Sequence, residues 1–288
     1  MLTGITGFLG SHLSTALLIK GWHVIGLKRR SSSLHRISEF LSDIELHNLE
    51  EIDSSLSKFR MSMIDAVVHT ATNYGRNGES FYRVFDSNTA FPLRILDLAL
   101  RSNVTLFLNT DTILDKYLNL YAFSKNQFLE WVKYVSADTD LAFTNIKLEH
   151  VYGPHDDSSK FSSFVIRTCA RNEPILSLTE GLQKRDFIYV DDVVSAYVAL
   201  LENENISRSK FSQFELGSGY AVSIRSFVEL AHRLSKSSTH LDFGAIPYRI
   251  GEVMHSCASP AHFNSLGWYP SYTLEQGIQS ILNSEFGF

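Results

Sequence analysis

The chain begins with three regularly spaced glycines, and this feature constrains its fold more than any other. Gly4, Gly7 and Gly10 lead directly into an amphipathic stretch over residues 10–20. Residues without a Cβ atom let the backbone approach a pyrophosphate closely, and the N-terminus of the following helix supplies N–H groups and a partial positive charge. The pattern predicts a dinucleotide-binding turn that opens a helix. A glycine-rich turn without a ligand is the alternative.

Short apolar runs alternate with amphipathic stretches behind this turn. The apolar runs occupy residues 23–27, 65–71, 104–110 and 141–148, and the amphipathic stretches occupy residues 10–20, about 80–101 and 121–136. This alternation predicts an α/β fold with a Rossmann-type, doubly wound parallel sheet, whose ligands bind at the carboxyl ends of the strands. Only residues 1–3 precede the glycine turn. We therefore expect a natural start further upstream, or a truncated first strand with some loss of stability.

The second half of the chain is less regular. Residues 185–201 pass from a strand pattern into a helix pattern, and the polar residues 202–213 are expected to form a surface loop. We predict a dinucleotide-binding Rossmann domain with a smaller, interleaved C-terminal substrate-binding lobe. The expected domain consists of residues 1–150 and about 183–218, and the expected lobe consists of about residues 151–182 and 219–288.

Composition argues against several other classes of protein. The net charge of -5 gives no reason to expect nucleic acid or an acidic membrane surface as a partner. No run approaches the roughly 18 apolar residues needed to cross a bilayer, and the start lacks a secretory signal pattern. The 2 cysteines cannot form a disulfide framework, and the 11 histidines have no HxxxH spacing. We expect a cytoplasmic protein without a metal.

A basic cluster follows the second apolar run. Lys28, Arg29 and Arg30 are followed by three serines at 31–33. In dinucleotide-binding folds an acidic residue at this strand end binds the adenosine ribose and favours NAD, whereas basic residues accommodate the 2′-phosphate of NADP. The cluster predicts NADP(H) as the cofactor, with a solvated charged loop as the alternative.

A tyrosine and a lysine four residues apart follow the apolar run at 104–110. Tyr121 and Lys125 share one helical face within reach of each other. A phenol has a pKa of about 10, and a neighbouring ammonium lowers that pKa, so the pair can move a proton. Thr110, with Thr112 in reserve, can stabilise negative charge on the oxygen of a carbonyl under reduction. An ordinary helix surface and a threonine that caps a strand end are the alternatives.

These elements, in this order, resemble the extended short-chain dehydrogenase/reductases that act on nucleotide sugars as epimerases, dehydratases and reductases. The resemblance runs nearly end to end and rests on TGITGFLG (3–10), VVHTA (67–71), YAFSK (121–125), VYGP (151–154), RDFIYVDDVV (185–194), LGSG (216–219) and GWYP (267–270). Within the family, ATNYG (71–75), FLNTDT (107–112), KLEHVYGP (147–154) and FGAIPYRIGEVMHS (243–256) resemble the CDP-abequose and CDP-paratose synthases, which are NADPH-dependent 4-ketohexose reductases. Sister reductases of dTDP-, GDP- or UDP-linked sugars share much of this pattern.

The resemblance implies reduction of the C4 keto group of a nucleotide-linked 4-keto-6-deoxy or 3,6-dideoxy hexose, in the synthesis of bacterial surface-polysaccharide sugars. Family dehydratases carry an Asp–Glu pair where this chain has Asp111 and Thr112, and epimerases usually carry an acid in place of Lys28 and Arg29. Net reduction is therefore the preferred interpretation. An NAD-dependent 4-epimerase, a 4,6-dehydratase and a non-catalytic NADP-sensing protein are the alternatives.

The resemblance also implies roles for individual residues. The expected catalytic residues are Thr110, Tyr121 and Lys125. The expected cofactor-binding residues are Gly4, Thr6, Gly7, Phe8, Leu9, Gly10, Lys28, Arg29, Arg30, Ala71, Asn88 and Lys125. The expected substrate-binding residues are Asn73, Tyr74, Arg76, Thr112, His150, Lys160, Arg185 and Arg249, with turn formers, ion pairs and solvated loops as the alternatives. We expect a homodimer, although the apolar stripe of residues 126–135 also suits packing on the chain's own sheet.

Overall fold

The computed structural model describes residues 1–52, 64–76, 78–102, 104–206 and 209–288. The chain divides into two compact units, and each unit is built from two separate segments. Unit 1 consists of Met1–Lys147 and Ala196–Phe214, and unit 2 consists of Leu148–Ser195 and Glu215–Phe288. Residues 183–195, which we expected in the Rossmann domain, belong to unit 2, where β9 (Lys184–Tyr189) pairs with β7 (His150–Tyr152) and β11 (Ala221–Ser223).

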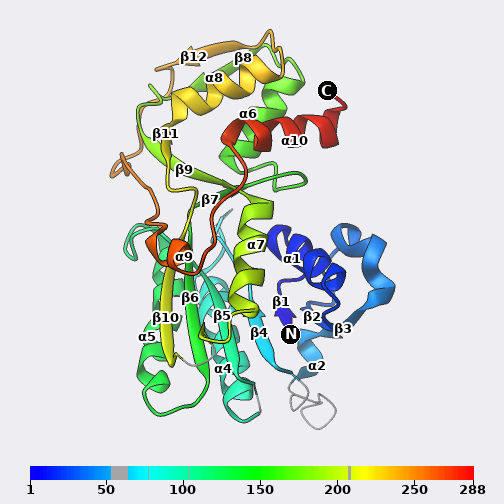
Figure 1. Cartoon of the computed structure of the whole chain (residues 1–288). Coiled ribbons are helices and arrows are strands. Elements are labelled where there is room, and N and C mark those ends of the chain that lie inside the picture. Colours follow the sequence, from blue (N-terminus) through cyan, green and yellow to red (C-terminus); the bar gives the residue numbers. More distant parts are fainter. Residues whose placement is uncertain (53–63, 77, 103, 207–208) are drawn as a thin grey trace. The chain divides into compact units, whose positions relative to one another are not determined.

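Unit 1 alternates strands and helices, most of which Figure 1 labels. Its strands are β1 (Leu2–Thr3), β2 (Val24–Lys28), β3 (Ile44–Asn48), β4 (Ala66–His69), β5 (Leu106–Thr112), β6 (Ala142–Leu148) and β10 (Phe211–Leu216), the last two ending at or just beyond its border. Its helical elements are α1 (Phe8–Ile19), η1 (His35–Asp43), α2 (Leu49–Ile52), α3 (Phe81–Phe85), η3 (Asp86–Ala90), α4 (Phe91–Leu100), α5 (Leu120–Ser136) and the second half of α7 (Val190–Leu201). The expected surface loop over 202–213 ends early, because half-buried Phe211 already begins β10.

The seven strands form one sheet in the order β10–β6–β5–β4–β1–β2–β3. The neighbours from β3 to β5 are parallel, and Leu2 of β1 lies between Gly26 of β2 and Val68 of β4. From β1 the chain builds outward first on one side and then on the other. Doubly wound sheets bind their ligands at such a reversal, beyond the carboxyl ends of the strands. The Rossmann-type sheet that the sequence predicts is confirmed.

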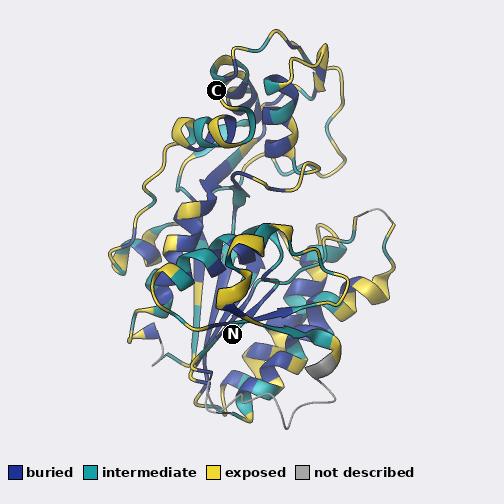
Figure 2. Cartoon of the chain, turned by 90° about the vertical axis from the view of Figure 1, so that its right-hand side faces the viewer, coloured by how far each residue is buried: buried dark blue, intermediate teal, exposed yellow. Residues whose placement is uncertain are grey.

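The apolar core of unit 1 lies between the sheet and the helices α4 and α5. Phe107 of β5 stacks on Phe143 of β6 with 5.2 Å between ring centroids, and Phe128 of α5 packs against both rings. Figure 2 shows the strands of this sheet as mostly buried. Each large apolar side chain buried in this way stabilises the fold by about 1.5–3 kcal/mol. The core therefore holds the ends of β4 and β5, and the start of α5, in fixed positions.

The glycine turn after β1 requires glycine at two positions. Gly4 has a φ of 70°, and a Cβ atom on it would lie 2.6 Å from the backbone nitrogen of Ala71. A Cβ atom on Gly10, in the first turn of α1, would collide with the carbonyl oxygen of Gly4. The turn therefore packs directly against the chain that leaves β4 and against its own helix. This close packing brings the start of α1 to the point where β1 and β4 meet.

The amphipathic stretch over about 80–101 forms one helical run, in which α3, η3 and α4 follow one another without a break. Ser80 caps α3 through its side chain, which accepts a hydrogen bond from the N–H of Arg83. The next five residues, η3, form a wider π turn, and α4 follows with a proline in its first turn. π turns inside helices reorient the side chains that they carry. Here the π turn directs Asn88 and Thr89 into the protein, where both bond to Ser124 of α5.

Unit 2 contains two small sheets and several helices. One sheet has the order β11–β9–β7, and the other pairs β8 (Ile175–Leu178) with β12 (His240–Phe243). The helices are α6 (Phe161–Ala170), the first half of α7, α8 (Ile224–Leu234), α9 (Ala261–Ser265) and α10 (Leu274–Phe286). Phe187 of β9 stacks on Phe227 of α8 with 4.3 Å between centroids, which ties the larger sheet to the helices.

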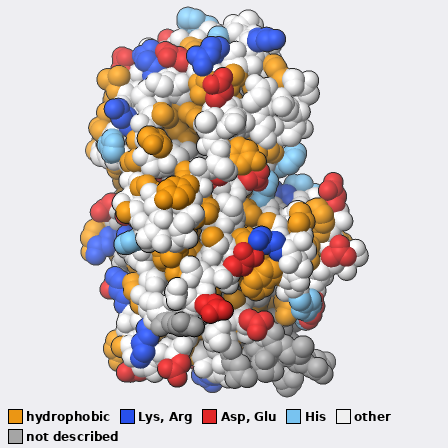
Figure 3. All heavy atoms as spheres, in the orientation of Figure 1, with side chains coloured by type: hydrophobic (Ala, Val, Ile, Leu, Met, Phe, Trp, Pro, Cys, Tyr) orange, Lys and Arg blue, Asp and Glu red, His pale blue; other side chains and the backbone are white. Residues whose placement is uncertain are grey.

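The surface mixes charges of both signs. Figure 3 shows Lys and Arg side chains interspersed with Asp and Glu on the face in view, together with scattered apolar side chains. Within the described residues, no helix is long and apolar enough to cross a membrane.

Candidate active site

Two side chains of α5 face the carboxyl end of β5. Asn119 caps the helix through its side chain, which accepts a hydrogen bond from the N–H of Ala122. Lys125 is 1% exposed, and its Nζ donates a hydrogen bond of 2.7 Å to the carbonyl oxygen of Thr110. Burial lowers the pKa of Lys125 to about 8, and the nearby carboxylate of Asp111 opposes that shift. The lysine is therefore held against the strand end that carries the two expected threonines.

The phenol of Tyr121 lies among aromatic and hydroxyl groups. Its ring is 5.0 Å from the ring of Tyr74, and the side chains of Thr112 and Thr72 form hydrogen bonds with its hydroxyl. Burial raises the pKa of Tyr121 well above its ordinary value, and Tyr74 and Asp111 act in the same direction. We expected a lowered pKa from the neighbouring ammonium. The direction is opposite, because loss of solvent around the phenol outweighs the hydrogen bonds from the threonines.

The two threonines of β5 have different partners. The hydroxyl of Thr110, our first choice beside the tyrosine, shares a hydrogen bond of 2.6 Å with the phenol of Tyr197 on α7. The hydroxyl of Thr112 accepts a bond from the N–H of Leu114 and contacts Tyr121. We expected Thr112 to bind the substrate, and the structure places it beside the phenol of Tyr121. Tyr197 was not among the expected residues, because nothing in the local sequence links it to Thr110.

Between these threonines, Asp111 turns into the interior of the sheet. It is 5% exposed, and its two carboxylate oxygens accept hydrogen bonds of 2.8 Å from the N–H of Thr112 and from the side-chain amide of Asn145 on β6. Both oxygens are thus engaged by the protein. The carboxylate supports the strand end rather than facing the open side of the site.

The loop after β4 is held by Asn88, which we expected to contact the cofactor. Its amide nitrogen donates to the carbonyl of Asn73 and to the hydroxyl of Ser124, at 2.7 and 2.9 Å. Its amide oxygen accepts from the backbone N–H of Asn73 at 2.8 Å and from Thr72 at 3.3 Å. The amide therefore uses its full bonding capacity within the protein. The structure places Asn88 as a support for the loop that carries Asn73 and Tyr74.

The same loop presents an arginine over an aromatic ring. The guanidinium carbon of Arg76 lies 4.9 Å from the centroid of Tyr74, and Tyr74 in turn lies beside Tyr121. A cation over a ring face is attracted by the quadrupole of the ring. Asn73 also accepts a bond from the N–H of Gly75, which fixes the turn. The structure thus brings Tyr74, Arg76, Tyr121 and Lys125 to one edge of unit 1.

The start of α1 suits a phosphate group. Gly7 is the N-cap of α1, and as a glycine it has no side chain that could occupy the space in front of the first turn. Thr6, Phe8 and Leu9 are half-buried around this turn, and Ala71 lies against Gly4. A helix start of this kind, with a close glycine approach, binds anions through its N–H groups and its dipole. The residues present therefore fit a dinucleotide pyrophosphate.

The basic cluster lies at the carboxyl end of β2. Lys28 donates a hydrogen bond of 2.9 Å to the side chain of Asn48 on β3, which directs it along the sheet. Arg29 and Arg30 are exposed, and the backbone N–H of Arg30 bonds to the carboxylate of Glu50. The cluster therefore contains two exposed guanidinium groups and one neighbouring carboxylate.

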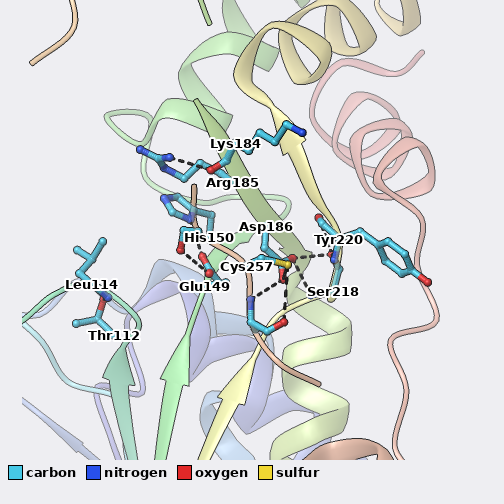
Figure 4. A network of polar contacts seen from close by, with 12 residues as sticks. Thr112, Leu114, Glu149, His150, Lys184, Arg185, Asp186, Ser218, Tyr220 and Cys257 are labelled. Carbon is cyan, nitrogen blue, oxygen red and sulfur yellow. Dashed lines mark hydrogen bonds and ion pairs between the residues drawn. The ribbon is translucent and has the colours of Figure 1, made fainter. Parts of the chain in front are cut away.

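In unit 2, three of the four expected substrate residues engage carboxylates. His150 bonds through Nδ1 to Glu149 at 3.1 Å, Lys160 pairs with buried Asp156 at 3.0 Å, and Arg185 pairs with Glu252 at 2.5 Å. The fourth, Arg249, lies in an exposed segment. Figure 4 shows His150 beside Glu149, and Arg185 bonded to the backbone of Lys184. Arg185 thus forms an ion pair, which was the alternative for this residue, and Lys160 forms an ion pair rather than lying in a solvated loop.

A buried carboxylate that we did not single out organises the LGSG turn. Asp186 accepts hydrogen bonds from the N–H and hydroxyl of Ser218 at 2.8 and 2.6 Å, from the N–H of Gly219 at 3.0 Å and from the N–H of Ala258 at 3.2 Å (Figure 4). A Cβ atom on Gly217 would collide with its carboxylate. Burial raises the pKa of Asp186, and the bonds from Ser218 and Gly219 oppose that shift. In the sequence, Asp186 directly follows Arg185 in a predicted strand, and this position was the one available indication of its role.

Across the parts of the chain that the structure describes, no three His, Cys, Asp or Glu side chains gather in a way that could hold a metal ion.

Comparisons with known proteins agree with this architecture. A model of the NAD dependent epimerase/dehydratase family matches residues 1–217. CDP-abequose synthases of Salmonella muenchen and Salmonella typhimurium are 33% and 32% identical to this chain, and each alignment covers 98% of this chain and 96% of the relative. The solved UDP-glucose 4-epimerase of Thermotoga maritima has a TM-score of 0.85 at 21% identity, covering 98% of this chain and 96% of that one. The UDP-glucuronic acid 4-epimerase of Bacillus cereus, solved with UDP-glucuronic acid and NAD, has a TM-score of 0.85 at 22% identity, covering 98% and 97%.

The family match covers well over half of the chain, and the two curated relatives extend the likeness over nearly all of it. The solved structures show that the fold of this chain is shared. The chain belongs to the NAD-dependent epimerase/dehydratase family of extended short-chain dehydrogenase/reductases.

Proposed function

We propose that this protein is an NADPH-dependent reductase of a nucleotide-linked 4-keto sugar. The substrate is a 4-keto-6-deoxy or 4-keto-3,6-dideoxy hexose, and the product serves the synthesis of bacterial surface-polysaccharide sugars. The observation that carries the proposal is the surroundings of Tyr121, a phenol beside hydroxyl groups whose nearby carboxylate, Asp111, is bonded to the protein through both oxygens. Similarity to two CDP-abequose synthases over nearly the full length of the chain supports it.

The raised pKa of Tyr121 favours reduction of a carbonyl over oxidation of a sugar hydroxyl. A reductase needs a phenol that gives a proton to the oxygen of the carbonyl, and a phenol with a raised pKa is protonated at neutral pH. An epimerase must also remove a proton from a sugar hydroxyl in the same site, which requires the phenolate. The environment of Tyr121 therefore suits proton donation.

The cofactor proposal rests on the glycine turn and the basic cluster. The first turn of α1, with Thr6, Phe8 and Leu9, would hold the pyrophosphate, and Arg29 and Arg30 would hold the 2′-phosphate. When bound, NADPH supplies the hydride that reduces the carbonyl carbon. Glu50 adds one negative charge near Arg30, so we assign the phosphate chiefly to Arg29.

The protein's own groups then complete the reduction at oxygen. Tyr121 donates its phenolic proton to the oxygen of the former carbonyl, which becomes the C4 hydroxyl. The hydroxyl of Thr110 donates a hydrogen bond to the same oxygen as negative charge develops on it. Lys125 holds its charge beside this strand end and stabilises the phenolate that remains. Tyr74 and Arg76 line the sugar side of the tyrosine.

In unit 2 we propose His150, Arg185 and Arg249 for the nucleotide diphosphate of the substrate, with Lys160 as a weaker contact. Arginine binds phosphate oxygens in a bidentate manner, and His150 presents the ring nitrogen that does not bond to Glu149. Arg185 must then share its guanidinium between Glu252 and the ligand. CDP is the preferred nucleotide, because the two full-length relatives are named as CDP-sugar enzymes.

A 4-epimerase remains the second candidate, because two of the solved proteins of similar fold are nucleotide-sugar 4-epimerases. Dehydration is less well supported, since Thr112 replaces a carboxylate and both oxygens of Asp111 are engaged. A purified epimerase of this family would retain bound NAD and would need no added cofactor. A non-catalytic NADP sensor would bind NADPH without oxidising it.

The decisive experiment measures NADPH oxidation against a panel of nucleotide-linked 4-keto-6-deoxy and 4-keto-3,6-dideoxy sugars, with NMR of the product. We expect turnover with at least one CDP-linked sugar and a new C4 hydroxyl. Tyr121→Phe should abolish turnover and leave NADPH binding intact, because the phenylalanine has no proton to donate. Absence of turnover with every sugar would remove the reductase proposal.

We also propose that the protein pairs with a second copy of itself through α3 and α5. These helices pack side by side and expose Phe81, Tyr82, Phe85, Trp131 and Tyr134. Phe85, Trp131 and Tyr134 line one shallow hollow on this face together with Gln127. Contiguous exposed aromatic groups of this kind are typical of protein–protein interfaces.

A further inference from the structure

We propose that Tyr197 is a positioning residue for the reaction, which orients the hydroxyl of Thr110 so that Thr110 donates its proton toward the substrate oxygen. This inference rests on the proposed reductase function. It adds a residue of α7 to a site whose other groups come from β5, α5 and the loop after β4.

The geometry of the pair is specific. The phenol oxygen of Tyr197 lies 2.6 Å from Oγ1 of Thr110, which is a short distance even for two hydroxyl groups. Tyr197 is 0% exposed, and Thr110 is half-buried at the carboxyl end of β5. Both residues belong to unit 1, and they are 87 positions apart in the sequence. The helix α7 therefore delivers a buried hydroxyl to the strand end of the site.

The direction of this hydrogen bond follows from what each group can reach. Of the described residues, Thr110 is the one hydrogen-bond partner of the Tyr197 phenol. A buried hydroxyl proton without an acceptor is costly, so Tyr197 must donate and Thr110 must accept. Burial also raises the pKa of Tyr197 far above its ordinary value, which keeps that proton in place.

Donation by Tyr197 leaves the proton of Thr110 for another acceptor. A hydroxyl has one proton and two lone pairs, and here one lone pair is already occupied. Thr110 is half-buried at the end of the strand, and Nζ of Lys125 bonds to the carbonyl of the same threonine. The main chain of Thr110 is thus held by Lys125 and its side chain by Tyr197. Together they present one oriented O–H group to an oxygen bound beside Tyr121.

A double-mutant cycle tests this role with the wild-type protein and three variants. Tyr197→Phe removes only the phenolic oxygen, and we expect kcat to fall roughly tenfold with KM for the sugar and for NADPH within about twofold. Thr110→Val removes the donor itself, and we expect kcat to fall roughly a hundredfold or more. Adding Tyr197→Phe to Thr110→Val should then change kcat by less than about twofold, because no hydroxyl remains to be oriented.

A matched control separates orientation from general loss of packing. Tyr189→Phe removes another buried phenol oxygen, which bonds to Ser280 at 2.7 Å in unit 2, and it should leave kcat within about twofold. Thermal unfolding of every variant verifies that each is folded at the assay temperature. Thr110→Ser supplies a second readout, because the serine side chain rotates more freely than the β-branched threonine. In that background Tyr197→Phe should cost more than in the wild type.

Each outcome decides between the two proposals. No turnover by the wild-type protein with any sugar of the panel removes the reductase function, and the role of Tyr197 falls with it. Turnover by the wild type with full activity of Tyr197→Phe overturns the role of Tyr197 alone. An additive cycle, in which Tyr197→Phe lowers kcat tenfold with or without the Thr110 hydroxyl, also overturns it. A loss confined to the Thr110-containing background supports it.

Discussion

At the scale of single residues, Lys125 ties activity to pH. Burial lowers its pKa to about 8, so its ammonium loses the proton as the pH rises through that value. In the reduction that we propose, the charged form stabilises the phenolate of Tyr121 after proton transfer, and the neutral amine does not. We expect kcat/KM for the sugar to fall above about pH 8, measured as a pH profile at saturating NADPH. A profile that stays flat well above that pH would contradict this role.

The sequence predicts those site residues whose chemistry is local. Tyr121 and Lys125 are one helical turn apart, and Gly4 and Gly10 lie in one turn, so spacing alone brings each pair together. Asn88 was assigned to the cofactor, yet its amide is fully used by the loop at Asn73. That outcome depends on contacts 15 residues away, which no local pattern encodes.

The partner of Thr110 lies further still from any local pattern. The sequence pattern predicts that Tyr197 lies on the apolar face of a helix. Its hydroxyl meets Thr110 only because α7 packs against the end of β5 in unit 1. The direction of the pKa shift of Tyr121 could not be predicted either, because it depends on how much solvent the folded protein removes from the phenol.

At the scale of elements, the strands and helices that the sequence predicts for unit 1 appear in their predicted order, whereas β3 and β10 were not among the predicted strands. The apolar run at 104–110 becomes β5 at Leu106–Thr112, because the polar residues at its end continue the ladder into the site. The helix pattern over about 80–101 conceals the π turn η3, since one extra residue in a turn leaves the apolar periodicity nearly intact.

The end of β2 is where we propose that the 2′-phosphate of NADPH binds. Arg29 is exposed there, and a charge-assisted bond to the 2′-phosphate is worth about 1.5–3 kcal/mol. Arg29→Ala should therefore raise KM for NADPH roughly tenfold or more and leave KM for NADH within about twofold. Lys20→Ala, which removes a surface lysine paired with Glu202, is the matched control. Equal losses with both cofactors would argue against a 2′-phosphate contact.

The pairing of β1 with β4 places a histidine in the core. The ring of His69 bonds through Nδ1 to the hydroxyl of Thr3 at 2.8 Å and packs against Phe91, while its Nε2 has no partner among the described residues. Burial lowers the pKa of His69 well below its ordinary value, and the charge of Lys125 acts in the same direction. As the pH falls, His69 therefore becomes protonated in the unfolded chain before it does so in the folded protein.

Stability should consequently fall as the pH drops below about 6.5, the ordinary pKa of histidine. The loss attributable to His69 approaches about 1.4 kcal/mol for each pH unit below that value. Urea unfolding of the wild type and of His69→Gln, compared at neutral and acidic pH, measures it. The variant should show the shallower pH dependence, whatever its absolute stability. Identical slopes would mean that the ring accepts a proton inside the fold.

At the scale of the whole molecule, the sequence predicts that two units are each built from separate segments, but it does not predict where the segments end. The chain leaves unit 1 after Lys147, returns at Ala196 and leaves again after Phe214. Because residues 185–201 read as one strand followed by one helix, the sequence gives no reason to divide them. The division falls inside α7, whose first half packs in unit 2 and whose second half carries Tyr197 into unit 1. A single helix thus belongs to both units, which a domain boundary drawn at loops cannot reproduce.

The dimer that we propose depends on the exposed aromatic face of α3 and α5. Trp131 is 54% exposed and Tyr134 is 79% exposed, and transfer of such rings out of water drives association. We expect light scattering to give twice the monomer mass for the wild type. Replacing both residues, as Trp131→Glu with Tyr134→Glu, should give a monomer. Formation of the dimer would then bury unpaired carboxylates in an apolar interface, which is costly.

Ile19→Glu provides the matched control for this change, since Ile19 is 79% exposed on α1, away from that face of α5. It should leave the mass of the assembly unchanged. If the wild type has the monomer mass at micromolar concentration, the aromatic face has another occupant. If the control also dissociates the assembly, the interface includes α1. A monomer obtained only from the α5 variant, with its circular dichroism unchanged, would locate the interface on the helix that also carries Tyr121 and Lys125.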